Sequence, residues 1–126
     1  MRIAIAQLNQ VVGDLRGNAA RIDEVIAAAA RTGADLVVTP ELSLCGYPPE
    51  DLLLRPAFLA ACAEALQQLA QRVAGPTVLV GFPEFADGKR YNAVAALRDG
   101  RVAAVYRKQQ LPNYTCLLYT SPSPRD

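Results

Sequence analysis

The first forty residues contain two short apolar runs separated by a helix-like stretch, and this pattern limits the fold more than any other feature. The runs, within residues 2–8 and 34–38, are nearly continuous in apolar side chains, which is typical of strands buried on both faces. Between them, apolar residues recur every three or four positions and predict an amphipathic helix. Its stripe consists of Ile22, Val25, Ile26, Ala29 and Ala30. A strand–helix–strand unit normally joins parallel strands by a right-handed crossover, so we predict an α/β protein.

The ends of the predicted helices are marked by residues with known roles at helix termini. Asn18 is predicted to cap the first helix, since its side-chain oxygen can accept from backbone N–H groups of the first turn. Gly33 suits the left-handed position after that helix. Pro56 fits the first turn of a second helix that ends before Gly75-Pro76. The apolar stripe of that helix consists of Leu59, Cys62, Leu66, Leu69 and Val73, and we interpret Cys62 as a packing residue.

The second half of the chain is predicted to form strands. Residues 77–80 read as a short buried strand that ends at Gly81, and Asp87-Gly88 marks a turn. Residues 91–97 and 102–106 flank Asp99-Gly100, which is a strong hairpin signal because both positions favour positive φ.

Composition excludes several functional classes. The 126 residues are 52% hydrophobic and 20% charged, enough for one domain with a core. A net charge of +1 without a basic cluster argues against nucleic-acid binding, and no apolar run reaches the roughly 18 residues of a membrane span. The three scattered cysteines predict no disulfide framework and no metal site, and we expect a cytoplasmic protein.

Glu41 stands where a buried strand ends. The run at residues 36–38 is stopped by Thr39-Pro40, because proline cannot donate to a sheet ladder. Ligand sites of α/β folds commonly open beyond the carboxyl ends of strands, so Glu41 is a candidate site residue. Gly46 and the prolines at 48 and 49 stiffen the following loop around Tyr47. The alternative is a solvated carboxylate after a strand. Glu84, after Phe82-Pro83, is either a second carboxylate of this site or a solvated turn residue.

Lys108 occupies a similar place after the strand at residues 102–106, followed by Leu111-Pro112. The alternative is a solvated lysine on a fraying strand. Residues 115–126 become rich in serine and proline without any periodicity, and we predict a disordered, non-native tail.

Two stretches together resemble the nitrilase (carbon–nitrogen hydrolase) superfamily. They are PELSLCGYPPEDLL at residues 40–53 and YRKQQLPNY at residues 106–114. GYPPEDLL, LPNY and the opening MRIAIAQLNQVVGDLRGNAARI are similar to the N-terminal glutaminase domains of glutamine-dependent NAD synthetases. The resemblance spans residues 1–114, predicted as the N-terminal part of such a domain. It implies an α/β fold that is part of a nitrilase-type α-β-β-α sandwich, with the first strands and two helices present.

The resemblance also implies a Glu–Lys–Cys triad. Glu41 would be the general base and Lys108 the cation that stabilises the tetrahedral intermediate, an effect worth about 3–4 kcal/mol for one good donor. Tyr47 and Tyr114 would line the glutamine pocket. The nucleophilic cysteine of the family lies on a later strand that this chain does not contain, and Cys45, Cys62 and Cys116 do not occupy its motif. The fragment alone is therefore expected to be inactive.

The implied function of the parent protein is release of ammonia from glutamine for ATP-dependent amidation of deamido-NAD. ATP and magnesium would bind a synthetase domain outside this chain, with no cofactor in the fragment. Glutamine would be the substrate, with no nucleic-acid or membrane partner and with homo-oligomers of the full-length protein. The alternatives are a stand-alone nitrilase-superfamily amidase and a non-catalytic α/β assembly module. The downstream reading frame distinguishes the three functions. A nucleotide-binding domain there would support the synthetase, and an early stop would support the stand-alone amidase. The lack of a cysteine after a buried strand would support the assembly module.

Overall fold

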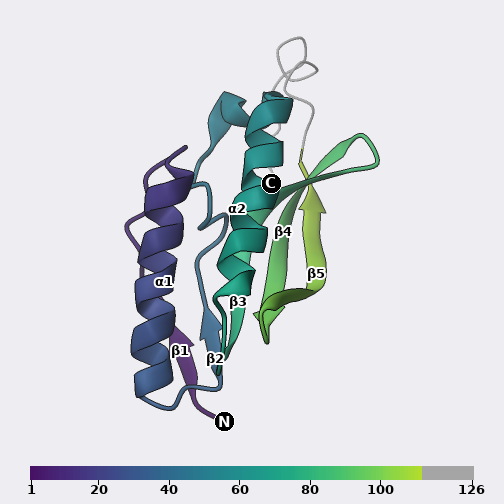
Figure 1. Cartoon of the computed structure of the whole chain (residues 1–126). Helices are drawn as coiled ribbons and strands as arrows, with labels where there is room; N and C mark the ends of the chain where they lie inside the picture. Colours follow the sequence, from purple (N-terminus) through teal and green to yellow (C-terminus); the bar gives the residue numbers. More distant parts are fainter. Residues whose placement is uncertain (112–126) are drawn as a thin grey trace.

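A sheet of five strands in the order β1-β2-β3-β4-β5 organises the computed structural model, which describes residues 1–111. Both long helices lie on the same face of this sheet (Figure 1). The strands are β1 (Ile3–Ile5), β2 (Leu36–Val38), β3 (Thr77–Ala86), β4 (Lys89–Arg98) and β5 (Arg101–Gln110). The helices are α1 (Leu15–Arg31), the 3₁₀ helix η1 (Glu50–Leu54) and α2 (Pro56–Gln71).

The first three strands are parallel and the last two are antiparallel. β1 pairs with β2, and β2 with β3, each in parallel, and the connections run through α1 and α2. β3, β4 and β5 form two successive hairpins, and in the turn of the second, Asp99 and Gly100 have φ of 53° and 80°. The predicted α/β class, the crossover and the Asp-Gly hairpin are confirmed. β1 is shorter than the predicted strand at residues 2–8.

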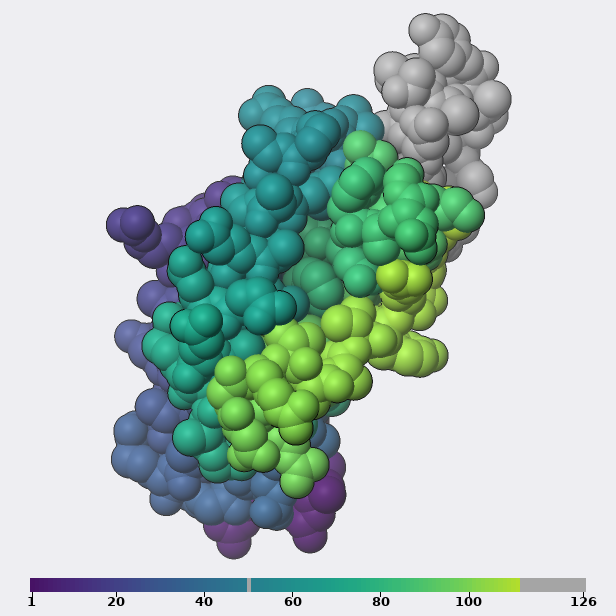
Figure 2. All heavy atoms as spheres, turned by 45° about the vertical axis from the view of Figure 1, so that its right-hand side comes forward, coloured from purple at the N-terminus to yellow at the C-terminus, as the bar shows by residue number. Residues whose placement is uncertain are grey.

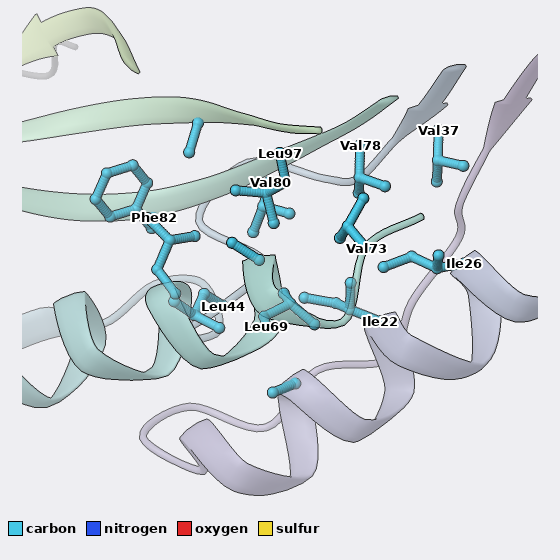
Figure 3. Packing of buried hydrophobic residues seen from close by; sticks show 14 of the residues in the cluster. Ile22, Ile26, Val37, Leu44, Leu69, Val73, Val78, Val80, Phe82 and Leu97 are labelled. Carbon is cyan, nitrogen blue, oxygen red and sulfur yellow. The ribbon is translucent and has the colours of Figure 1, made fainter. Parts of the chain in front are cut away.

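The core fills the space between the helices and the sheet (Figure 3). The fully buried side chains that meet there come from α1, α2 and the three central strands; they include Ile22, Leu69, Val37, Val78, Val80 and Leu97. Burial of such a side chain contributes about 1.5–3 kcal/mol. Cys62 belongs to this cluster and is 0% exposed, which confirms its interpretation as a packing residue.

The first helix begins earlier than predicted, and Asn18 does not cap it. Asp14 is the N-cap, and its carboxylate accepts from the backbone N–H of Gly17 at 3.0 Å. Asn18 is instead fully buried in the first turn. Its side chain bonds to the backbone of Val11 and donates to the carbonyl of Leu44 at 3.0 Å. The side-chain amide of asparagine can bind backbone groups either at a helix N-cap or between two buried loops. The residue type alone therefore did not distinguish these two roles.

The third strand continues past Gly81, where the sequence predicted its end. β3 pairs with β4 from Val78↔Leu97 to Ala86↔Lys89, so the ladder runs through Phe82-Pro83. β2 pairs with β3 only as far as Val38↔Leu79. Beyond that point β3 has no strand on its β2 side within residues 1–111, so Pro83, which has no backbone N–H, can be accommodated in β3. At Gly81, β3 is closely approached by the backbone of residues 40–42.

The sheet face opposite the helices carries apolar side chains without a covering layer in the described residues. Ile3 and Ile5 are 53% and 75% exposed, and Leu36, Val38, Leu79 and Val94 are half-buried. Residues 1–111 thus form one sheet and one helical layer of the predicted sandwich. Within this part of the chain, no helix is both long and apolar enough to cross a membrane.

Candidate active site

The turn that carries Glu41 is fastened to β3 by hydrogen bonds on both sides of the carboxylate. Before it, the backbone N–H and the hydroxyl of Thr39 both donate to the carbonyl of Leu79, at 3.0 and 2.8 Å. After it, the N–H of Leu44 donates to the carbonyl of Gly81 at 3.0 Å. The N–H of Gly81 donates in turn to the Thr39 hydroxyl at 3.3 Å. These bonds fix where Glu41 leaves the sheet.

Gly81 allows this close contact because it has no side chain. A Cβ atom at this position would lie 2.5 Å from the backbone nitrogen of Leu42 and 2.7 Å from the carbonyl oxygen of Pro40. Both neighbours are backbone atoms of the Glu41 turn and cannot rotate away. Gly81, which the sequence predicted as the end of a strand, is therefore the position at which the Glu41 turn packs against β3.

The far side of the same loop is held by the segment between β1 and α1. The side-chain amide of Gln10 donates to the carbonyl of Ser43 at 2.7 Å, and Asn18 binds the next carbonyl, that of Leu44. Gly46 has φ of +83° and packs against the backbone of Val12, so a side chain could not be accommodated there. The part of the loop from Ser43 to Gly46 is therefore anchored by hydrogen bonds and by backbone contact.

The Glu41 side chain is exposed and has one hydrogen-bond donor in the described structure. The Nδ2 group of Asn92, on β4, donates to Glu41 Oε2. Asn92 is 2% exposed. Asn92 was not predicted from the sequence as a site residue. The sequence feature that could have identified it is a single asparagine in the apolar run at residues 91–97, because asparagine is unfavourable in a strand.

Lys108 lies at a bulge in β5, directly opposite the Asn92 step of β4. Asn92 pairs with Gln109 and Ala93 pairs with Arg107, so Lys108 is the extra residue between them. Bulges redirect side chains and occur often beside active sites. The strand is longer than the predicted residues 102–106 and does not fray as the alternative required, because pairing with β4 continues to Gln110.

Glu41 and Lys108 line the same pocket, which has a volume of about 600 Å³. The pocket opens on the sheet face away from the helices, and its floor is apolar. Besides those two residues and Thr39-Pro40, its lining consists of Val38, Leu79, Val94, Ala96, Ala104, Val105 and Tyr106. No direct ion pair joins Glu41 to Lys108 in the described part of the chain. The topology therefore brings the two predicted residues to one site.

The other candidate residues lie elsewhere or outside the described structure. Tyr47 is 64% exposed and is not part of the pocket lining within residues 1–111. Tyr114 lies outside the described residues. Glu84 pairs with Arg107, with an Oε1–Nε distance of 2.7 Å, and lines a second hollow of about 430 Å³ between α2 and the edge of the sheet (Figure 2). Glu84 is therefore neither a second carboxylate of the Glu41 pocket nor a free turn residue.

The two cysteines among the described residues are poor nucleophiles. Cys45 and Cys62 are fully buried, and burial raises the pKa of each thiol from 9.0 to about 12. A thiol must lose its proton to attack a carbonyl, so neither group is activated. Cys116 lies outside the described residues.

The arrangement supplies two groups that proton-transfer chemistry uses. A carboxylate on an anchored turn can take a proton, and an ammonium beside it can stabilise a developing oxyanion.

The comparisons with known proteins agree with this geometry. The sequence model of the carbon-nitrogen hydrolase family matches residues 2–125. Glutamine-dependent NAD(+) synthetases from Xanthomonas campestris and Thermotoga maritima are 51% and 48% identical to the chain over 115 and 116 residues. These matches cover 90% of this chain but only 21% and 20% of the relatives, so the chain spans about a fifth of their length.

Solved structures give the same result. The glutamine-dependent NAD(+) synthetase from Cytophaga hutchinsonii matches with a TM-score of 0.83 and 31% identity, covering 90% of this chain and 20% of that one. An amidase from Nesterenkonia sp. matches with a TM-score of 0.73 and 30% identity, covering 90% of this chain and 44% of that one. The five-stranded sheet with two helices is thus a fragment of a nitrilase-type fold, and the chain belongs to the carbon–nitrogen hydrolase family.

Proposed function

We propose that residues 1–111 are the N-terminal part of a glutaminase domain in a glutamine-dependent NAD synthetase. In the complete protein, this domain releases ammonia from glutamine, and a synthetase domain uses the ammonia to amidate deamido-NAD. The observation that carries the proposal is the shared pocket of Glu41, on the turn after β2, and Lys108, on β5. Among solved structures, the synthetases match with TM-scores of 0.83 and 0.80 and the amidase with 0.73, and a curated synthetase is 51% identical to the chain, which supports this function over the stand-alone amidase.

In this mechanism Glu41 acts as general base and Lys108 stabilises charge. A cysteine thiol from the part of the domain beyond this chain gives its proton to Glu41 and attacks the glutamine amide carbon. The oxygen becomes an oxyanion that the Lys108 ammonium stabilises. The C–N bond then breaks, the leaving ammonia takes the proton back from Glu41, and a thioester remains. Water then attacks the thioester while Glu41 accepts its proton. The C–S bond breaks, Glu41 returns the proton to the leaving cysteine sulfur, and glutamate is released.

The ATP and magnesium of the synthetase reaction would bind outside this chain. Among the described residues, no group of three or more histidine, cysteine, aspartate or glutamate side chains gathers at one place. The steps above involve neither ligand.

A hybrid enzyme tests the proposal. Residues 1–111 of this chain replace the matching segment of the Xanthomonas campestris relative, which supplies the rest of the domain. The unsubstituted hybrid should release ammonia from glutamine. Glu41→Gln keeps the shape of the side chain but removes the base, so we expect turnover to fall by about 10²- to 10⁴-fold with an unchanged melting temperature.

The matched control is Glu84→Gln, which changes a carboxylate outside the pocket and should keep the turnover of the unsubstituted hybrid. A folded hybrid that does not hydrolyse glutamine would contradict the proposed function. Turnover retained by Glu41→Gln would contradict the role of the base.

A further inference from the structure

Asn92 is an unexpected residue for its position in the sheet. It lies in β4 between Tyr91 and Ala93 and is only 2% exposed. Asparagine is depleted in strands, and burial of an amide is unfavourable unless its polar atoms are hydrogen-bonded. A small apolar residue would suit a strand whose neighbours are mainly alanine, valine and leucine.

The hydrogen bonding of Asn92 does not serve the sheet. Its Nδ2 group donates to Glu41 Oε2, whereas its Oδ1 atom is buried and has no hydrogen-bond partner among the described residues. Buried polar atoms without a hydrogen-bond partner are rare in folded proteins, and a role in catalysis is one reason for their presence. The side chain of Asn92 thus directs its described hydrogen bond to the carboxylate of the candidate site while its other polar atom stays unpaired.

The backbone of Asn92 is held rigidly from both sides. It pairs with Pro83 of β3 and with Gln109 of β5, in the middle of a three-stranded antiparallel ladder. The bulge that carries Lys108 lies directly across from it. A donor placed here has a fixed position relative to both predicted residues of the pocket, unlike a donor on a loop.

We propose that Asn92 is a positioning residue that orients the Glu41 carboxylate for proton transfer, an inference that rests on the function proposed above. Glutamate has three rotatable side-chain bonds, and the exposed Glu41 has no other described donor to hold it. A hydrogen bond to Oε2 fixes the plane of the carboxylate and leaves Oε1 to accept the proton of the thiol. Small errors in such an alignment reduce rates by up to about a hundredfold.

The experiment compares Asn92→Ala and Asn92→Asp in the hybrid enzyme, alone and combined with Glu41→Gln. Asn92→Ala should lower kcat by about ten- to a hundredfold with little change in KM, because orientation and not binding is lost. If Asn92 acts through Glu41, then Asn92→Ala should cost almost nothing further when Glu41 is already glutamine. Leu97→Val is the matched control, since it changes a buried side chain of β4 that faces the helices and should keep kcat.

Asn92→Asp adds a readout that a purely structural residue would not change. The new carboxyl can donate to Glu41 only when it is protonated, and it repels Glu41 when ionised. The kcat of this variant relative to that of Asn92→Ala should therefore rise as the pH is lowered.

Equal losses from Asn92→Ala with and without the Glu41 base, or a pH-independent ratio of the two variants, would overturn the positioning role. So would full kcat in Asn92→Ala. These outcomes are measured against the unsubstituted hybrid. A folded but inactive unsubstituted hybrid contradicts the proposed function itself, so the two failures are distinguishable.

Discussion

Gly81 determines where Glu41 lies, because the turn rests directly on its backbone. Adding one methyl group by Gly81→Ala would place a carbon 2.5 Å from the nitrogen of Leu42, which forces the turn away from β3. We expect a loss of about 1–3 kcal/mol in the free energy of unfolding, the usual cost of overpacking, together with loss of glutamine hydrolysis in the hybrid. Thermal melting and ammonia release measure the two effects.

Gly88→Asn is the matched control for that substitution. Gly88 also lies in β-hairpin structure, but a Cβ atom there meets nothing within 4 Å, and asparagine tolerates its φ of +73°. This variant should keep its activity and most of its stability. If Gly81→Ala behaved like Gly88→Asn, then the close contact would not position the turn.

The two buried cysteines predict a definite pH dependence. Their pKa values are raised by burial from 9.0 to about 12, so the folded state keeps both protons at pH values where the unfolded state loses them. The free energy of unfolding should therefore fall as the pH rises from about 9 to about 12, and it should be unaffected by these thiols below that window. Cys62→Ala should weaken this alkaline dependence in equilibrium unfolding measured across the window.

The same burial protects the thiols from alkylation. In the folded hybrid at pH 8, iodoacetamide should leave Cys45 and Cys62 unmodified, and both should react once the protein is unfolded in urea, as peptide mass spectrometry can show. Rapid modification of either residue without unfolding would contradict the burial on which the pH prediction depends.

Among the elements, those with a strong period or a specific turn signal could be predicted from the sequence. Each of these patterns is compatible with only one type of secondary structure. They are the apolar stripes of α1 and α2, the apolar run at residues 36–38 and the Asp99-Gly100 turn. The end of β3 was missed because Gly81 and Pro83 stop strands in general, whereas here the partner strand β4 continues the ladder. Such pairing depends on a neighbour that local patterns do not identify.

The candidate site was predictable only in part for a similar reason. Glu41 and Lys108 follow recognisable apolar runs and motifs, but the bulge that turns Lys108 toward the pocket has no local sequence signature. Asn92 was missed because its role depends on a carboxylate 51 positions away in the chain. The role of Tyr47 stays a prediction, since its side chain is exposed in the described fragment.

The bulge in β5 gives a prediction about two adjacent cations. Arg107 pairs with Glu84 and stacks 4.4 Å above the ring of Tyr91, whereas Lys108 lines the Glu41 pocket. In the proposed mechanism Lys108 stabilises the oxyanion, so Lys108→Gln should lower glutamine turnover in the hybrid by about 10²- to 10³-fold.

Lys89→Gln changes an exposed lysine at the start of β4 and should have no such effect on turnover. Equal turnover in the two lysine variants would contradict the assignment of Lys108.

The isolated chain should not behave as a stable monomer, because residues 1–111 leave one face of the sheet without a covering layer. Ile3 and Ile5, with Leu36, Val38, Leu79 and Val94 beside them, form an apolar surface on residues 1–111 that a second sheet covers in a sandwich. We expect purified 1–126 to self-associate and to melt over a broad range, as size-exclusion chromatography with light scattering and calorimetry would show.

Ile5→Lys places a charge on that face at a position that is already 75% exposed, so it should reduce self-association without disturbing the helix-covered core. Val25→Lys, on α1 at the other face, provides the comparison, since a charge there disturbs a side chain packed against the core and leaves the open surface intact. A monomeric wild-type chain with a sharp cooperative transition would show that the sheet needs no second layer. The fragment would then be a folding unit of its own.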